Sequence, residues 1–262
     1  MTDGPTGRAG SGLIAALPMY DRPGTRSAHD RLWQLIARDL PGAPAALTRP
    51  SDPWQVWTSP DLLLAQTCGL PYREILHDRV TLVATPVHDL PCPPGQYDSV
   101  LIARADDRRQ TLADFDGAAF AYNEGLSQSG WAAPMTALRA AAVQPGDFLE
   151  TGAHAASARA VASGAADLAG IDAVTWAILR DHDPAPAALR VIGRSAASPA
   201  LPWITARDRD PDPIRRALAR AIADLSADDR STLHLSGMTL VPSATYLAQR
   251  DRFVAPRRKG NA

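Results

Sequence analysis

The chain has 262 residues, with 27 Lys and Arg against 28 Asp and Glu, and its net charge at pH 7 is −1. This length is enough for one large domain or for two lobes with their own buried cores. The balanced charge provides no electrostatic surface for nucleic acid or for an anionic membrane. The basic run at residues 257–259 is short and terminal, and we interpret it as part of a solvated tail.

The start of the sequence predicts neither export nor membrane insertion. Residues 1–12 are rich in Gly, Thr and Asp, and the apolar run that follows, residues 13–19, is interrupted by Pro18. A secretory signal would need a basic segment, a longer apolar core and a small-residue cleavage site. No run reaches the roughly 18 apolar residues that a membrane helix needs. The sequence by itself therefore predicts a protein that stays in the cytoplasm.

Cysteine and histidine usage gives no support for a metal site. The two cysteines, Cys68 and Cys92, are too few for a disulfide framework and wrongly spaced for zinc. Pairing between them stays open because it depends on their geometry. The six histidines also lack the spacing of metal ligands, and they stand at positions 29, 77, 88, 154, 182 and 234. We expect neither a metal nor a cofactor.

Strands and helices are predicted to alternate along the chain. Short, mostly apolar runs predict buried strands at residues 12–20, 45–48, 62–65, 80–86, 97–103, 118–122, 148–152, 166–171, 189–192 and 199–205. Helical spacing of apolar residues or Ala-rich composition predicts helices at residues 28–40, 72–77, 111–116, 131–142, 153–163, 172–179, 213–225 and 227–235. This alternation predicts an α/β fold with parallel sheets.

The junction between the strand at 118–122 and the helix at 131–142 is the most informative stretch. It carries Ser127, Gln128, Ser129 and Gly130 directly before the helix. The first turn of a helix has unpaired N–H groups and a partial positive charge, so hydroxyls placed there suit an anion. Gly130 would let the backbone approach a ligand closely. The alternative is an ordinary N-cap, in which Ser127 or Ser129 closes its own helix.

Two later junctions carry similar polar groups. His154 stands at the start of the predicted helix 153–163, with Ser157 on the same helix face, and a ring N–H there can donate to an oxyanion. Asp172 places a carboxylate at the end of the next strand. Singly, each is explained equally well as a helix cap or a solvated residue. Three neighbouring strand ends with Ser, His and Asp favour a common ligand site.

A Ser, His and Asp set also raises the possibility of a hydrolase. The serine loop does not have the Gly-x-Ser-x-Gly form of a nucleophile elbow. The sequence contains neither a P-loop nor a Gly-x-Gly-x-x-Gly run. Binding without catalysis is therefore the better interpretation of these residues.

Four motifs in this order resemble the phosphate-, phosphite- and phosphonate-binding proteins of ABC transporters. The motifs occupy residues 97–102, 127–130, 151–154 and 166–172, and the similarity extends from about residue 13 to residue 253. The resemblance implies a type II periplasmic-binding-protein fold, in which two α/β lobes are joined by two crossing strands and enclose a ligand. It implies a first lobe of residues 12–101 and 203–253, a second lobe of residues 102–202, and disordered tails at 1–11 and 254–262.

The resemblance also implies the function and the site. Members of this family capture a small oxyanion and deliver it to an ABC transporter permease. Their ligand residues correspond to Tyr97, Ser127, Ser129, Gly130 and His154. Gln128 replaces the middle hydroxyl of the family's Ser-Thr-Ser run, and residues 201–203 lack the acidic residue of the returning strand. Both departures argue against an aminoalkylphosphonate.

Several expectations remain open at this stage. Asp172 lies near the family's other acidic position, and Trp54, Trp57 and Trp203 lie in or beside predicted edge loops, where they either stack on a ligand or pack in a core. The resemblance implies a periplasmic protein, in conflict with the start of the sequence. The alternatives are a cytosolic sensor, or an enzyme that resembles the thiamine-pyrimidine synthases or uses His154 as a base.

Overall fold

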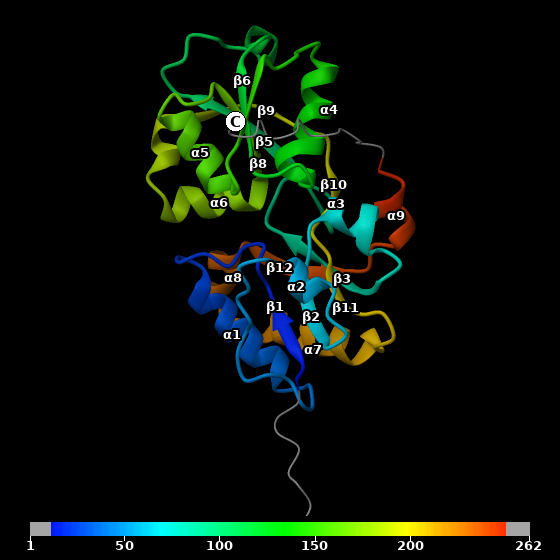
Figure 1. The fold of residues 1–262 in the computed structure, drawn as a ribbon. Coiled ribbons are helices and arrows are strands. Elements are labelled where there is room, and N and C mark those ends of the chain that lie inside the picture. The colour runs from blue at the N-terminus through cyan, green and yellow to red at the C-terminus, as the bar shows by residue number, and fades with distance from the viewer. Residues whose placement is uncertain (1–11, 250–262) are drawn as a thin grey trace, which may run out of the picture.

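The computed structural model describes residues 12–249, which form two α/β lobes (Figure 1). Both expected tails, residues 1–11 and 254–262, lie outside the described residues, as do residues 250–253 of the expected first lobe. No helix within residues 12–249 is long and apolar enough to cross a membrane.

The first lobe is built on a five-stranded sheet with the order β1-β2-β11-β3-β12. Its strands are β1 (Ile14–Ala16), β2 (Leu62–Gln66), β3 (Val80–His88), β11 (Trp203–Ala206) and β12 (Leu235–Thr239). Its helical segments are α1 (Arg26–Ala37), α2 (Trp54–Trp57), α3 (Gly69–Pro71), the π-helical turn η1 (Tyr72–Leu76), α7 (Pro211–Asp224), α8 (Ala227–Leu233) and α9 (Ser243–Leu247). Because β11 lies antiparallel between β2 and β3, the returning chain completes this sheet.

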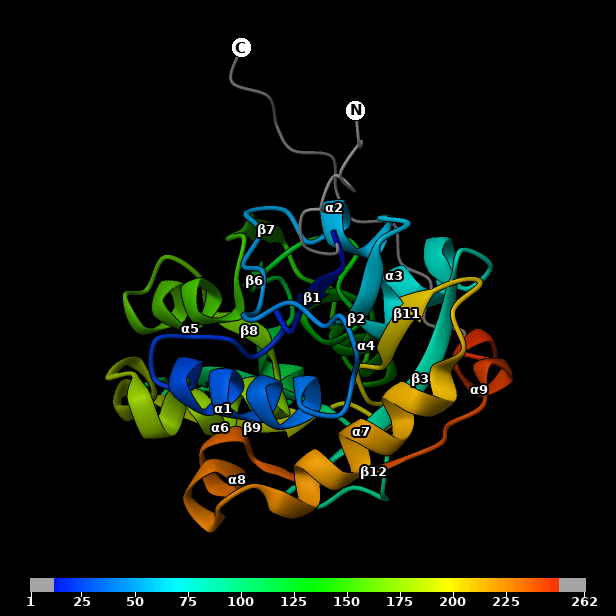
Figure 2. The same ribbon diagram turned by 90° about the horizontal axis from the view of Figure 1, so that it is seen from below.

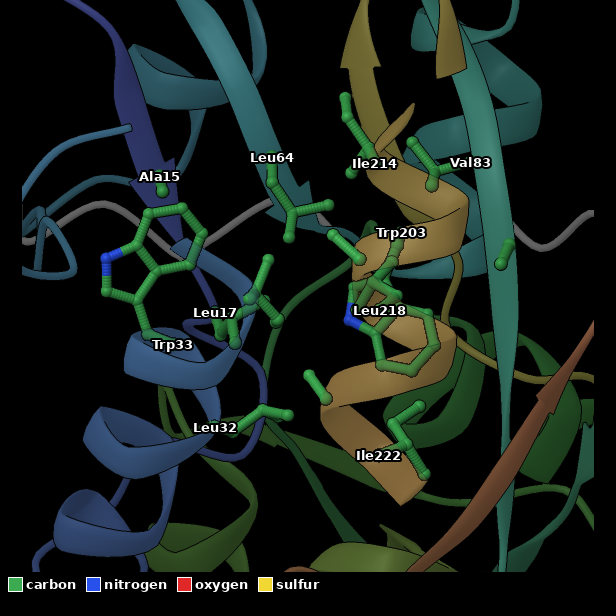
Figure 3. Close-up of a cluster of buried hydrophobic side chains, with 14 of the residues drawn as sticks. Ala15, Leu17, Leu32, Trp33, Leu64, Val83, Trp203, Ile214, Leu218 and Ile222 are labelled. Atoms are coloured by element: carbon green, nitrogen blue, oxygen red, sulfur yellow. The ribbon is translucent and has the colours of Figure 1, made fainter. Parts of the chain in front are cut away.

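The main core of this lobe lies between the sheet and two helices, α1 and α7, which lie side by side (Figure 2). The amphipathic helix α7 begins at Pro211 behind the capping residue Asp210, whose side chain accepts from the N–H of Asp212. Its apolar residues recur every three or four positions, so they share one face, which packs onto the sheet. Figure 3 shows Ile214, Leu218 and Ile222 of α7 with Leu32 and Trp33 of α1, Trp203 of β11 and further buried side chains of the same cluster.

The second lobe has a sheet with the order β7-β6-β8-β5-β9. Its strands are β5 (Ser99–Arg104), β6 (Ala119–Tyr122), β7 (Asp147–Glu150), β8 (Leu168–Asp172) and β9 (Leu189–Arg194). Its helical segments are the 3₁₀ turns η2 (Leu112–Phe115) and η4 (Ala185–Ala188), the π-helical turn η3 (Gln128–Ala132), α4 (Ala133–Ala140), α5 (His154–Ala162) and α6 (Ala173–His182). The parallel strands β6, β7 and β8 lead into η3, α5 and α6 respectively, so their carboxyl ends gather the expected site residues on one edge of the sheet.

The chain passes between the lobes at a two-stranded ladder. Strand β4 (Gln96–Tyr97) pairs antiparallel with β10 (Ser198–Pro199). The boundary expected between residues 101 and 102 falls inside β5, whose residues pair with β8 and β9 from Ser99 onward. The second boundary, before residue 203, coincides with the start of β11.

The sheets are mixed, so the expectation of parallel sheets was wrong in part. Strands β11 and β12 run antiparallel to β3, and β5 runs antiparallel to both β8 and β9. A continuous apolar run reports burial on both faces of a strand and carries no information on its direction. The strand expected at residues 45–48 is absent, and the helix expected at 227–235 ends at Leu233, where β12 soon begins.

Candidate ligand site between the two lobes

Side chains from both lobes meet beside the β4–β10 ladder. The Tyr20 hydroxyl, from the loop after β1, donates to a carboxylate oxygen of Asp172 at 3.1 Å. Arg73 of η1 donates to the side-chain oxygen of Gln128 at 2.9 Å, and the Gln128 N–H lies 3.4 Å from the sulfur of Cys68. These contacts join the ends of β1 and β2 in the first lobe to η3 and β8 in the second lobe.

We call the group at this junction the interlobe polar cluster, and we define it by the hydrogen bonds and charge effects that link its members. Tyr20 and Asp172 are hydrogen-bonded, as are Ser129 and His154. The others act electrostatically on these residues or on one another. The cluster consists of Tyr20, Arg22, Cys68, Tyr97, Ser129, His154 and Asp172. It contains Tyr97, Ser129, His154 and Asp172 of the sequence-predicted site.

The serine loop, residues 127–130, is buried, and its side chains make contacts with different partners. The Ser127 hydroxyl caps η3 by accepting from the Gly130 N–H at 2.9 Å, as the N-cap alternative predicts. Gln128 uses its side chain for the contact with Arg73 across the lobes. The Ser129 hydroxyl lies 3.2 Å from Nε2 of His154. A ligand role is therefore best supported for Ser129, while Ser127 can still donate its hydroxyl proton.

Gly130 is packed so tightly that the site depends on its missing side chain. A Cβ at this position would stand 1.8 Å from the Asn123 side-chain oxygen and 3.1 Å from Cε1 of His154. The backbone of η3 thus comes directly against two polar side chains of the neighbouring strand ends. This close approach is the reason for glycine at position 130.

His154 is neutral in the folded protein. Burial, reinforced by the positive charge of Arg22, lowers its pKa to about 3. Its Nδ1 atom is buried and has no hydrogen-bond partner within the described chain, although the Gly170 carbonyl lies close enough to oppose part of the shift. A neutral imidazole has one N–H donor and one acceptor, so it can bridge Ser129 and an oxyanion without carrying charge.

Asp172 is both a helix cap and a charged member of the cluster. One of its oxygens accepts from the Thr175 N–H at 2.9 Å at the start of α6, and the other accepts from Tyr20. Burial raises the pKa of this carboxyl to about 6, while these hydrogen bonds and Arg22 act in the opposite direction. Because both oxygens already accept hydrogen bonds from the protein, Asp172 does not require a cationic partner from a ligand.

Two hydroxyls at this junction are buried without a partner. Tyr97 is 1% exposed and Thr67 is 0% exposed, and neither hydroxyl has a hydrogen-bond partner among residues 12–249. Burial, followed by the charges that Cys68 and Asp172 carry when ionised, raises the pKa of Tyr97 well above its usual range, so the phenol keeps its proton. Native proteins rarely leave such groups unsatisfied, so these hydroxyls point to polar atoms that the protein itself does not supply.

The three tryptophans that the sequence offered as ligand residues, Trp54, Trp57 and Trp203, do not belong to the interlobe polar cluster. Trp203 is 3% exposed and belongs to the first-lobe core between the sheet and α7 (Figure 3). Trp54 and Trp57 stack edge to face at 5.2 Å, and Trp57 donates its indole N–H to the Gln66 carbonyl. Trp203 is the first residue of β11, within the strand expected at residues 199–205, and the alternation of the strand directs its side chain into the core of the lobe.

Other features of the described chain lie apart from the cluster. Cys68 and Cys92 are both free thiols, which answers the question of their pairing. Surface cavities of about 580, 410 and 450 Å³ are lined by residues of other segments, among them Arg79, Arg180 and Arg215. Within residues 12–249, no group of three His, Cys, Asp or Glu side chains is placed to hold a metal ion.

The sequence reasoning missed several members of the junction. Tyr20 and Arg22 follow β1, Thr67 and Cys68 follow β2, and Asn123 follows β6. Their common signal was available, since each is a polar or small residue directly beyond a short apolar run. What the sequence could not show was that two strands of the first lobe end opposite the serine loop of the second.

Two mixed five-stranded sheets joined by paired crossing strands define a type II periplasmic-binding protein. A family model described as ABC transporter, phosphonate, periplasmic substrate-binding protein matches residues 61–245. The chain therefore belongs to this family of phosphonate substrate-binding proteins. A comparison with curated protein sequences gives no match.

Solved structures agree on the fold. The binding protein component of an ABC phosphonate transporter from Pseudomonas aeruginosa superposes with a TM-score of 0.70 at 16% identity, over 90% of this chain and 82% of that one. PhnD1 from Prochlorococcus marinus in complex with methylphosphonate gives 0.68 at 17% identity, over 89% and 94%. MatC from Rhodopseudomonas palustris with bound malate gives 0.59 at 15% identity, over 88% and 90%.

Proposed function

We propose that this protein is a non-catalytic solute-binding protein that captures a small phosphorus oxyanion between its lobes for an ABC transporter permease. The observation that carries the proposal is the pair of buried hydroxyls without partners at Tyr97 and Thr67, together with the Ser129–His154 pair of the second lobe. Tyr97 lies near Ser129, and Thr67 precedes Cys68, which contacts Gln128. Each hydroxyl buried without a partner costs about 1–3 kcal/mol, and a ligand oxygen that accepts from it removes that cost.

The chemistry of the cluster suits an oxyanion of the phosphonate, phosphate or phosphite class. Tyr97 and Thr67 supply hydroxyl donors, and the hydrogen-bonded Ser129–His154 pair supplies one more donor, which is the Ser129 hydroxyl or the N–H at Nδ1 of His154 according to the imidazole tautomer. Hydrogen bonds to an ionised oxygen are shorter and about twice as strong as those between neutral groups. The family match and the methylphosphonate bound to the Prochlorococcus protein support the same class.

The arrangement also supports closure of the lobes around a ligand. The cluster takes Tyr20, Arg22 and Cys68 from the first lobe and Ser129, His154 and Asp172 from the second. A ligand that touches both halves favours the state in which the lobes are together, because only that state makes all the contacts. The permease would then distinguish the closed form from the open one.

The geometry argues against the hydrolase alternative. A serine nucleophile needs a basic histidine whose second nitrogen is oriented by a third group, usually a carboxylate. Here burial lowers the pKa of His154 to about 3, and Nδ1 has no hydrogen-bond partner within residues 12–249. The Ser129–His154 pair is therefore better suited to hold an anion than to activate a nucleophile.

A binding screen tests the proposal directly. We expect the melting temperature of the purified protein to rise with at least one of phosphate, phosphite, methylphosphonate and 2-aminoethylphosphonate, with sulfate and malate as comparison anions. A ligand at 100 times its dissociation constant adds about 2.7 kcal/mol, which is a rise of roughly 5–10 °C for a chain of this size.

Variants locate the effect. Ser129→Ala and His154→Ala should reduce the thermal shift, whereas Ser163→Ala, at an exposed helix end, should leave it unchanged. A protein that binds none of the phosphorus oxyanions, or that binds them equally well after both cluster substitutions, would contradict the proposal. Turnover of a bound compound would instead support the enzyme alternative.

A further inference from the structure

The loop between β1 and α1 is held in one conformation by its own hydrogen bonds. The Thr25 hydroxyl, which is fully buried, donates to the Tyr20 carbonyl at 2.6 Å and accepts from the Arg22 N–H at 3.0 Å. The N–H groups of Thr25 and Arg26 both donate to the Arg22 carbonyl. This loop lies at the junction with the second lobe (Figure 1), so it presents the side chains of Tyr20 and Arg22 from a fixed backbone.

The Arg22 side chain differs from the other arginines of this region. Arg26, Arg31 and Arg49 each form an ion pair with an aspartate. The half-buried Arg22 forms neither an ion pair nor a side-chain hydrogen bond within residues 12–249, and its Nε atom is buried without a partner. A guanidinium has five N–H donors, and a buried donor without a partner, such as the N–H at Nε of Arg22, is costly.

Arg22 lies near the second-lobe half of the cluster, because Tyr20 in the same loop is hydrogen-bonded to Asp172. Burial lowers the pKa of Arg22, while Asp172, Tyr20 and Asp183 act to raise it and Arg159 acts to lower it. Its positive charge in turn lowers the pKa of His154. Arg22 thus lies within electrostatic reach of His154 and Asp172, which frame the second-lobe half of the cluster, but it forms no ion pair with Asp172.

We propose that Arg22 is a ligand-binding residue, and that its guanidinium contacts the anionic oxygens of the ligand from the first lobe, opposite Ser129 and His154. This inference rests on the proposed function and deepens it. The planar guanidinium can bind two oxygens of one phosphoryl or phosphonyl group at once. Without Arg22, the negative charge of Asp172 would repel an anion and the remaining groups would be neutral donors. The positive charge of Arg22 offsets the negative charge of Asp172.

The preferred ligand is therefore a small oxyanion that offers at least two charged oxygens on one centre. Phosphate, methylphosphonate and phosphite share this chemistry, and sulfate shares it without a titratable proton. An ammonium group gains little at this position, because Arg22 would repel it and because Arg22 and two hydrogen bonds already offset the charge of Asp172. Methylphosphonate should accordingly bind at least as tightly as 2-aminoethylphosphonate.

The experiment measures dissociation constants by titration calorimetry and the apo stability by urea unfolding, in wild type, Arg22→Gln, Arg22→Lys and Arg26→Gln. The probes are phosphate, methylphosphonate, phosphite, sulfate and 2-aminoethylphosphonate. Arg26→Gln is the matched control, because it removes the same charge from an exposed side chain four residues away. Removing a buried partner of a charge pair weakens binding by about 30-fold or more, and Arg22→Gln should show at least this loss.

We expect Arg22→Lys to retain part of the affinity, because it keeps the charge without the paired donors, and Arg26→Gln to behave as wild type. The apo stability of Arg22→Gln should equal or exceed that of wild type, since the side chain has no partner to lose. Two outcomes would overturn the inference while the proposed function stands: wild-type affinity in Arg22→Gln, or a loss of binding that only accompanies a loss of apo stability. A wild-type protein that binds none of the probes would instead overturn the proposed function itself.

Discussion

Replacing Tyr97 by phenylalanine should have opposite effects on the protein alone and on its complex. The Tyr97 hydroxyl is buried without a hydrogen-bond partner in residues 12–249, although Ser129 lies near enough to influence its pKa. Removing an unsatisfied buried hydroxyl relieves its desolvation cost, which is about 1–3 kcal/mol. The apo protein should therefore be as stable as wild type or more stable, and its melting temperature should stay constant or rise.

The complex should be weakened by the same substitution. A hydrogen bond to a charged group contributes about 1.5–3 kcal/mol, which corresponds to a dissociation constant roughly 10- to 150-fold higher. Titration calorimetry with the oxyanion that stabilises wild type best measures this change. Melting curves without ligand measure the other half of the prediction.

Tyr72→Phe provides the matched control. Tyr72 is 2% exposed, and its hydroxyl is hydrogen-bonded to Ser243 at 2.8 Å in the first lobe. This substitution should cost the apo protein about 0.5–1.5 kcal/mol and leave ligand affinity unchanged. If Tyr97→Phe behaved like Tyr72→Phe, the Tyr97 hydroxyl would have a structural partner, and its assignment to the ligand would be refuted.

Three further substitutions test other parts of the structure. Gly130→Ala should weaken ligand binding and cost about 1–3 kcal/mol, because its Cβ would stand 1.8 Å from the side-chain oxygen of Asn123; Gly193→Ala, whose nearest neighbour is 3.7 Å away, is the control in the same assays. Burial raises the pKa of Asp172 to about 6, above the usual value near 3.9, so its ionisation penalises the folded state as pH rises. Urea unfolding should show wild type losing about 2 kcal/mol relative to Asp172→Asn between pH 4 and pH 7, and parallel pH profiles would contradict the shift. Trp203→Ala should cost about 3–5 kcal/mol with unchanged ligand affinity in the surviving folded protein, whereas a selective loss of affinity would return Trp203 to the site.

The sequence could predict which polar residues of the candidate site stand at the end of a strand, but not which partners each of them contacts. Ser129 and His154 could be selected as candidates because a hydroxyl or an imidazole at the start of a helix is a local feature of the chain. Ser127 and Gln128 belong to the same loop, yet one is used for an N-cap and the other for a contact with Arg73. Neighbours in sequence thus have different roles because their partners come from different elements.

Arg22 and Thr67 carried only the weak local signal of a polar residue beyond a short apolar run. Each became a candidate only when the folded chain showed one of its polar atoms buried without a partner, near residues more than 100 positions away. For Trp203 the structure instead removed a candidate that the sequence had suggested. A large amphipathic side chain near a predicted edge fits a ligand wall and a core equally well, and only the position of Trp203 within β11 decided for the core.

The sequence by itself determined the alternation of strands and helices, the polar strand ends of the second lobe and the order of motifs that shows the family, because these depend on periodicity and on residues close together in the chain. Only the tertiary structure decided the direction of β5, β9, β11 and β12, and which first-lobe residues meet the serine loop. The reason is physical: burial and helical spacing are encoded locally, whereas strand direction and the meeting of two lobes depend on how distant segments pair. The charge that Arg22 brings to the site belongs to this second class.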